Sequence, residues 1–211
     1  MKETYKRVIE NIISLGIING INFMIPLVTL PYLIKTIGIN NYGAYSIVYS
    51  MLQYGILFTA YGFGFSSTQQ IAQNREEVDI VNRIVNATLF SRLAIMIIFI
   101  IIMGFICLIV YPKEYFIMYL WGLGIVLGDI LNPTWLYQGM EKMKYMTIIN
   151  LVCKSVFTIL IFVFIRRESD YIYITLLNSI GYIIAGGISM FLGYRLFNIK
   201  LFLPKQKHIF E

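Results

Sequence analysis

The sequence predicts an all-α integral membrane protein, a bundle of six transmembrane helices. Of its 211 residues, 58% are hydrophobic and 13% are charged, whereas a soluble domain usually carries roughly 25% charged residues. Glu10 and Lys35 bracket 24 uncharged residues, and Lys35 and Arg75 bracket 39. Arg92 and Lys113 bracket 20. A helix needs about 20 apolar residues to cross a bilayer. Barrel strands would be about 10 residues long and strictly alternating, so the longer runs favour helices.

The runs set the order of the spans. The run after Glu10 is too long for the h-region of a cleaved signal and has no small-residue cleavage site before Lys35, so an uncleaved first span is expected. The next run exceeds one crossing, and its end, up to Asn74, is expected to form a helical extension at the inner interface. One bundle over residues 1–211 is therefore predicted, with spans at about 12–34, 42–65, 84–111, 115–137, 145–165 and 171–197.

The positive charges predict the orientation. With the N-terminus inside, the inner segments hold 11 Lys and Arg residues and the outer segments hold 4. Inner loops of membrane proteins carry this excess, so both termini are expected to be cytoplasmic. Because the charges are spread over several loops rather than focused on one face, nucleic acid is not an expected partner. The four outer cations are Lys35, Lys113, Arg166 and Arg167.

Several kinds of site are excluded within this chain. Cys107 and Cys153 both fall in predicted spans, so they are expected to be packing residues rather than a disulfide framework. His208 is the single histidine, which excludes a histidine-based metal site or a Ser-His triad. The chain has no Gly-x-x-x-x-Gly-Lys-Ser/Thr loop for nucleotide hydrolysis. No cofactor, no metal and no enzymatic activity are therefore expected.

Glycine and proline mark features inside the spans. Pro26 and Pro31 lie in the outer half of the first span, where each removes a backbone donor. They indicate either a tolerated kink or a hinge of the kind transporters use. Gly-x-x-x-Gly spacing lets helices approach closely, and we interpret two such pairs as packing sites: Gly16 with Gly20, and Gly124 with Gly128.

Three ionisable residues fall inside predicted spans. Arg92, Asp129 and Lys154 each lie 8 or 9 residues from the inner end of their span, roughly 12–14 Å along the helix at 1.5 Å per residue. Because charges in lipid are costly, they should face the bundle interior or a watery cavity. One interpretation is a structural ion pair plus one snorkelling cation. The other is a hydrated, net-cationic cavity for an anionic headgroup. Asp129 could instead titrate and carry a coupling proton.

The most informative segment closes the fourth span. Pro133 can bend the helix there, while Trp135 and Tyr137 can anchor it near the interface, and Glu141, with the lysines that follow, makes a short inner loop. A wider belt of interfacial tyrosines is expected to include Tyr111, Tyr115, Tyr145 and Tyr171. Two charged clusters are interpreted as solvated loops: Arg75, Glu76, Glu77 and Asp79, and Arg166, Arg167, Glu168 and Asp170. The segment consists of Asn132, Pro133, Thr134, Trp135, Leu136, Tyr137, Gln138, Gly139, Met140, Glu141, Lys142, Met143 and Lys144.

This segment carries a resemblance to a known family. Two earlier stretches, which precede it in the same order as in the family, add to the resemblance: Pro26-Leu27-Val28-Thr29-Leu30-Pro31-Tyr32-Leu33 and Tyr61-Gly62-Phe63-Gly64. Along most of its length the chain resembles the N-terminal half of Wzx-type polysaccharide (O-antigen repeat-unit) flippases, of the multidrug/oligosaccharidyl-lipid/polysaccharide exporter superfamily. The resemblance implies one half of a two-bundle transporter with a central cleft. Such proteins move undecaprenyl-pyrophosphate-linked oligosaccharide across the bacterial inner membrane, by alternating access, for O-antigen, lipopolysaccharide or capsule synthesis.

The resemblance also implies partners and leaves alternatives. The expected partners are the lipid-linked oligosaccharide, the bilayer and a second six-helix half or other polysaccharide assembly proteins, and transport by this chain alone is not expected. A cationic cavity suits a pyrophosphate-sugar headgroup, which makes Arg92 and Lys154 candidates. A multidrug efflux relative would often have an acid in the first span, and a lipid II flippase would usually have arginines there; neither is present. A membrane enzyme of the same pathway would need clustered acids or a large outer loop.

Overall fold

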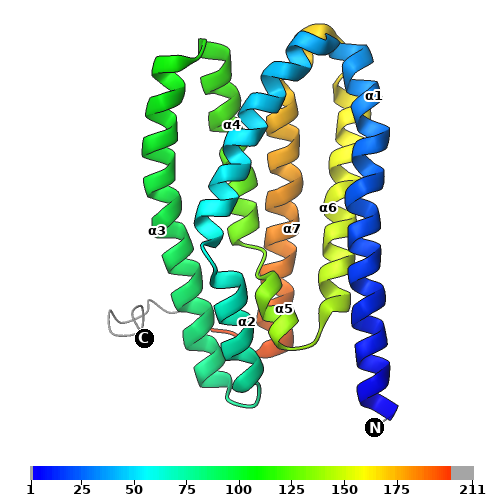
Figure 1. The fold of residues 1–211 in the computed structure, drawn as a ribbon, viewed down its shortest axis with the longest axis vertical. Helices are drawn as coiled ribbons and strands as arrows, with labels where there is room; N and C mark the ends of the chain where they lie inside the picture. The colour runs from blue at the N-terminus through cyan, green and yellow to red at the C-terminus, as the bar shows by residue number, and fades with distance from the viewer. Residues whose placement is uncertain (1, 201–211) are drawn as a thin grey trace.

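The computed structural model describes the backbone of residues 2–200, and the side chains of that range except 2–12, 14, 15, 17–19, 21, 22, 26 and 153. Within this part the chain is helical, and its long helices stand side by side as a bundle (Figure 1). The all-α prediction is thus confirmed. The elements are α1 Lys2–Ala60, α2 Phe63–Gln73, α3 Val78–Val110, α4 Lys113–Ile130, α5 Thr134–Gly139, α6 Met143–Phe164, the 3-10 helix η1 Glu168–Tyr173 and α7 Ile174–Phe197.

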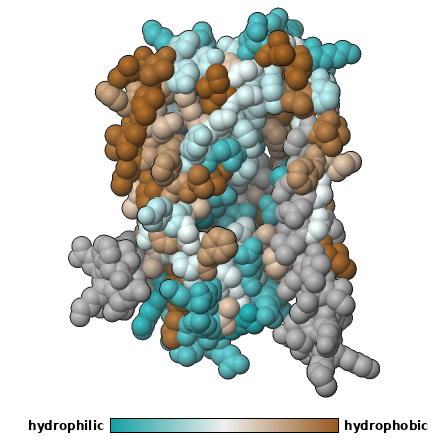
Figure 2. Space-filling view, viewed as in Figure 1, coloured by the Kyte–Doolittle hydropathy of each residue, from teal (hydrophilic) through white to brown (hydrophobic). Residues whose placement is uncertain are grey.

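The helices have the length and surface of a membrane protein. Helix α3 exposes a row of aliphatic and aromatic side chains, including Ile97, Ile98, Ile101 and Phe105, and Figure 2 shows this side of the molecule as strongly hydrophobic. A soluble monomer rarely exposes so continuous an apolar patch, whereas lipid covers it at no cost. Five segments of the described chain are long and apolar enough to cross a membrane: Phe23–Gln73, Val78–Val110, Lys113–Gly139, Met143–Phe164 and Glu168–Phe197.

Helix α1 contains a sharp bend. Gly38 has φ 80° and ψ 160° and separates two helical arms, called here the first arm (2–37) and the second arm (39–60). This backbone conformation is open almost only to glycine. The predicted spans 12–34 and 42–65 lie mostly on separate arms. The backbone at Pro26 and Pro31 is helical, so the bend lies beyond both prolines, and a hinge at either one stays a prediction.

A second break follows the second arm. Tyr61 (φ 26°) and Gly62 (φ 79°) have left-handed backbone conformations, which end the helix at Ala60. The helix therefore ends five residues before the predicted end of this span at residue 65, and the span bounds stay a prediction. Helix α2 then runs from Phe63 to Gln73, which confirms the predicted helical extension. Helix α3 begins at Val78, six residues before the predicted start of its span.

The third break lies in the Asn132 to Lys144 segment. The predicted span 115–137 is not one helix, because α4 ends at Ile130 and α5 begins at Thr134. Pro133 lacks a backbone N–H and disfavours a helical conformation at Asn132, which explains why the chain turns here instead of bending smoothly. The predicted last span is also divided, since η1 occupies its first three residues and α7 begins at Ile174.

Helices α4 and α7 form the centre of the bundle. A Cβ added to Gly128 would overlap the backbone of Tyr182, and one added to Gly124 would lie 2.8 Å from the Ser179 Cβ. The two helices therefore approach backbone to backbone. For Gly16 and Gly20 a Cβ would meet no described atom within 4 Å, so close packing is confirmed at the second pair alone.

The remaining helices surround this centre. The second arm of α1 packs on α4, where Leu52 fills the space above Gly122. The first arm packs on α6, where the Tyr32 hydroxyl donates to the Ile165 carbonyl at 2.7 Å. Helix α3 packs on the outside of α4. The start of α1, the α2–α3 and α5–α6 turns and the end of α7 share the lower end of the bundle in Figure 1.

Candidate functional site

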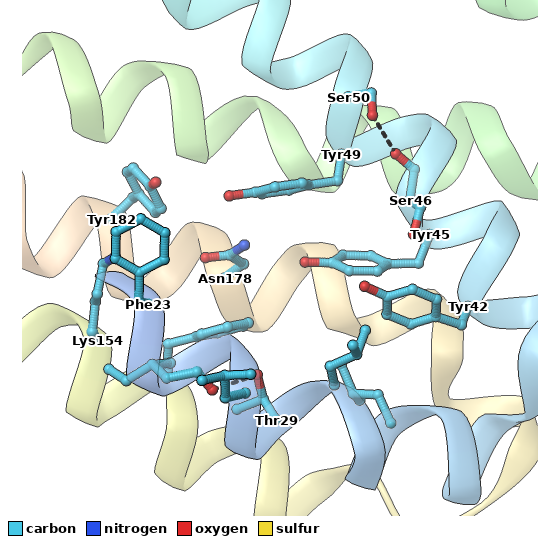
Figure 3. Close-up of a pocket in the computed structure, with 15 residues that line it drawn as sticks. Phe23, Thr29, Tyr42, Tyr45, Ser46, Tyr49, Ser50, Lys154, Asn178 and Tyr182 are labelled. Carbon is cyan, nitrogen blue, oxygen red and sulfur yellow. Dashed lines mark hydrogen bonds between the residues drawn. The ribbon is translucent and has the colours of Figure 1, made fainter. Parts of the chain in front are cut away.

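The face in Figure 2 is hollowed between the two arms of α1, with hydrophilic residues visible at depth. A pocket of about 670 Å³ lies there, walled by both arms, α6 and α7. We call it the tyrosine pocket. Its first-arm wall is largely apolar, and its other walls carry polar groups. The polar side chains shown in Figure 3 include Tyr42, Tyr45, Tyr49, Asn178, Tyr182 and Lys154.

Tyr42, Tyr45 and Tyr49 form a ladder along the second arm. Their spacing of three and four residues places them on one face of the helix. The rings of Tyr45 and Tyr49 stack at a centroid distance of 5.6 Å, and those of Tyr42 and Tyr45 are tilted at 5.9 Å. In Figure 3 the hydroxyls of Tyr45 and Tyr49 point toward Asn178 on α7. The ladder therefore presents hydroxyl groups to the pocket from a rigid aromatic wall.

Lys154 supplies the charge of the tyrosine pocket. It lies on α6, is half-buried and is the single charged side chain among the described residues that line the pocket. Tyr182 lies one turn after Asn178 on α7, and in Figure 3 it stands with Lys154 on the opposite side of Asn178 from the ladder. The pocket thus combines one cation with hydroxyl and amide groups, a set that can bind an anionic, hydroxyl-rich group.

Arg92 and Asp129 lie elsewhere and bind each other. The Arg92 Nη2 atom lies 2.6 Å from the Asp129 Oδ2 atom, and Nη1 lies 3.5 Å from the Asp129 carbonyl oxygen. The Arg92 side chain is buried, and the pair joins α3 to α4. Neither residue lines the tyrosine pocket. Of the three predicted charges, the structure therefore brings together Arg92 and Asp129, and Lys154 faces the cavity; their role in transport stays a prediction.

The Asn132 to Lys144 segment is a packing element. Trp135 and Tyr137 are buried, so the prediction that they anchor the helix at the interface was wrong. The Tyr137 hydroxyl donates to the Ser189 carbonyl at 2.5 Å, which ties α5 to α7. Gly139 packs so closely that a Cβ would lie 2.7 Å from Ile71 Cγ2 on α2.

Arg75 is more than a solvated loop residue. Its Nε atom donates to the Gly139 carbonyl at 2.6 Å, and its Nη1 atom lies 2.8 Å from the Glu141 carboxylate. The turn after α2 is thereby fixed to the turn after α5. The two other charged residues of the turn, Glu76 and Glu77, are exposed, as predicted for a solvated cluster.

The sequence analysis also named the cysteines, the histidine and a belt of tyrosines. Cys107 is buried in α3, which confirms its packing role, and Cys153 lies within α6. His208 lies outside the described residues. The Tyr111 and Tyr115 rings stack at 5.4 Å beside the α3–α4 turn.

The pocket residues on α1 and α7 were not predicted. The sequence did contain a pattern that could have indicated them, because the ladder tyrosines have helical spacing and Asn178 and Tyr182 are four residues apart. Aromatic residues in apolar spans, however, are more often core or interface residues than binding groups. The spacing alone therefore did not distinguish pocket-lining residues from packing residues.

Comparison with known proteins identifies the family. A family described as "Polysaccharide biosynthesis protein" matches residues 8–211. The chain belongs to this family. The resemblance to Wzx-type polysaccharide flippases is thus confirmed at the level of the family.

Two curated members of similar sequence are each named "Putative O-antigen transporter". The one from Escherichia coli (strain K12) is 31% identical over 182 residues, covering 86% of this chain and 44% of that protein. The one from Shigella dysenteriae is 30% identical over 191 residues, covering 87% of this chain and 46% of that protein. The chain therefore spans less than half the length of these relatives. No solved structure matches it.

Proposed function

We propose that this member of the polysaccharide biosynthesis family takes part in moving an undecaprenyl-pyrophosphate-linked oligosaccharide across the bacterial cytoplasmic membrane. The observation that carries the proposal is the tyrosine pocket, which places Lys154 among tyrosine hydroxyls and Asn178 between helices of a membrane protein. A cation can bind phosphate, and hydroxyl and amide groups can bind sugar hydroxyls. The names of the two curated relatives support this substrate class.

The proposal includes an arrangement in the membrane. The two arms of α1 each cross the bilayer, giving six spans with both termini cytoplasmic. The lower end in Figure 1 is then cytoplasmic. This end holds most of the predicted inner cations, in agreement with the positive-inside rule. A second six-helix half completes the cleft, and alternating access of the two halves exposes the pocket to each side in turn.

Export of surface polysaccharide tests the proposal. Residues 1–211 replace the matching segment of the E. coli relative, and the chimera is expressed in cells that lack that transporter. We expect Lys154→Met to abolish export and Lys154→Arg to retain part of it. Lys144→Met is the matched control, because Lys144 is an exposed cation on the same helix outside the pocket. Full export with Lys154→Met would contradict the role of the pocket. Export by the 211-residue chain expressed alone would contradict the need for a second half.

The aromatic walls raise a second candidate, export of organic cations. Aromatic faces attract such cations, but Lys154 repels them, and no carboxylate lines the described pocket. Drug resistance conferred by the same chimera, without polysaccharide export, would favour this candidate. A role as a membrane enzyme of the pathway has no comparable support, because both relatives are named "Putative O-antigen transporter".

A further inference from the structure

A second cavity, of about 340 Å³, lies between α2 and α3, and it shares no lining residue with the tyrosine pocket. We call it the α2–α3 pocket. It lies toward the lower end of the bundle, where α2 stands beside the start of α3 (Figure 1). Most of its lining residues are polar: Ser66, Ser67 and Gln70 from α2, and Arg83, Thr88 and Ser91 from α3.

The floor of this pocket is fixed by a buried hydrogen bond. The hydroxyl oxygens of Ser67 and Thr88 lie 2.8 Å apart, and both side chains are buried. The bond joins α2 to α3, so the pocket has a defined polar base. Ser91, half-buried, adds a third hydroxyl one turn further along α3.

Arg83 is the cation of the α2–α3 pocket, and it differs from its neighbours. Arg75 and Arg92 each bind a carboxylate, whereas Arg83 forms no ion pair with any residue that the structure describes. It is exposed at the rim. Asp79, one turn earlier on α3, is not among the lining residues, and no carboxylate lines the pocket. A guanidinium and several hydroxyl groups that line one pocket offer hydrogen-bond donors for a phosphate group.

The surroundings favour a lipid over a dissolved anion. The remaining walls are apolar, with Phe63, Ile80 and Ile84 among them. Beside them the break before α2 exposes the Tyr61 ring and α2 exposes the Phe65 ring, which are 80% and 88% exposed. Tyrosine is enriched where a membrane protein meets the headgroup region, and an exposed phenylalanine adds apolar surface for lipid. Apolar walls can cover the acyl chains of a lipid, whereas inorganic phosphate would gain nothing from them.

We propose that the α2–α3 pocket binds the phosphate headgroup of an anionic membrane phospholipid, with Arg83 holding the phosphate and the Ser67, Thr88 and Ser91 hydroxyls lining its base. The site is separate from the transport cavity, so it stands whether or not the proposed function holds.

Lipid retention by the full chain tests this site. The purified chain, in detergent, is mixed with equal amounts of phosphatidylglycerol and phosphatidylcholine, and bound lipid is counted by native mass spectrometry. We expect selective retention of phosphatidylglycerol, reduced several-fold by Arg83→Gln. Arg195→Gln is the matched control, because it removes an exposed cation from the last turn of α7, at the same end of the bundle. An equal loss with both variants, or no selectivity in the parent chain, would overturn the proposal.

Two further measurements cover the remaining outcomes. Arg83→Lys keeps the charge and removes the planar fork, so we expect it to fold as the parent does and to retain less phosphatidylglycerol. Retention equal to that of the parent chain would show general charge attraction and would overturn the assigned geometry. Inorganic phosphate, added at the concentration of the lipid, should not displace phosphatidylglycerol. Displacement would assign the site to a free anion instead of a lipid.

Discussion

Arg92 on α3 and Asp129 on α4 form an ion pair between the two helices, with one guanidinium nitrogen 2.6 Å from the carboxylate and another 3.5 Å from the Asp129 backbone carbonyl. The Arg92 side chain is 5% exposed and that of Asp129 is 31% exposed. Removing one partner leaves the other charge without compensation in a poorly hydrated place. The pair therefore couples the position of α3 to that of α4.

We predict that Arg92→Met destabilises the protein by roughly 3 kcal/mol, the lower end of the cost of breaking a buried pair. We use the lower end of this energy range because the Asp129 side chain keeps some contact with solvent. The double variant Arg92→Met/Asp129→Leu should recover most of this loss, since apolar residues replace both charges. Thermal unfolding in detergent measures both effects. A double variant no more stable than Arg92→Met would contradict a structural pair.

Gly128 gives a second prediction, because it lies where α4 meets the backbone of α7. Gly128→Ala adds a Cβ that overlaps the Tyr182 backbone, and overpacking of this kind costs about 1–3 kcal/mol. Gly187→Ala is the control, since a Cβ there meets no described atom within 4 Å. We expect a lower unfolding temperature for the first variant and little change for the second. Equal unfolding temperatures would show that the α4–α7 crossing can relax.

The sequence was sufficient for features that depend on composition and on single residues. Long uncharged runs predicted the helices, and the length of the second run, which exceeds one crossing, predicted the helical extension seen as α2. The spacing of Gly124 and Gly128 predicted a close approach of helices, which the structure shows between α4 and α7. Each of these follows from local chemistry, either the length needed to cross a bilayer or the absence of a side chain.

Features that depend on tertiary contacts were not predictable in the same way. The depth estimate placed Arg92, Asp129 and Lys154 at one level, but a depth along a helix does not say which way a side chain faces. Lys154 is on α6, which packs on α1 and α7, whereas Arg92 and Asp129 join α3 to α4. Tyr137 was predicted to lie at the interface because tyrosine is common there. In the structure it is buried, and its hydroxyl donates a hydrogen bond to the Ser189 carbonyl.

Gly38 leads to a third prediction. Its φ of 80° and ψ of 160° lie in a region that costs a non-glycine residue about 1–3 kcal/mol. Gly38→Ala should therefore lower the unfolding temperature, or straighten α1 and displace the second arm. Gly43→Ala, at a helical position with open space around it, should have little effect. Spin labels on the two arms would report their separation, and an unchanged distance with unchanged stability would contradict the prediction.

The last prediction concerns Arg75, which joins the turn after α2 to the turn after α5. Arg75→Gln removes both the bond to the Gly139 carbonyl and the contact with Glu141, and we expect a loss of about 1 kcal/mol, typical of one hydrogen bond. Glu141→Gln removes only the ion pair, whose side chains are 37% and 41% exposed, so less than about 0.5 kcal/mol is expected for such a surface pair.

Amide hydrogen exchange distinguishes these two contributions. Arg75→Gln should speed exchange in α5, because the carbonyl at its end loses a donor and the turn can open more often. Glu76→Gln, which removes an exposed neighbouring charge, is the control. If Glu141→Gln sped exchange in α5 as much as Arg75→Gln, the ion pair and not the Gly139 carbonyl would hold the two turns together. Because α5 packs on α2 through Gly139 and Ile71, we expect the faster exchange caused by Arg75→Gln to extend into the second half of α2.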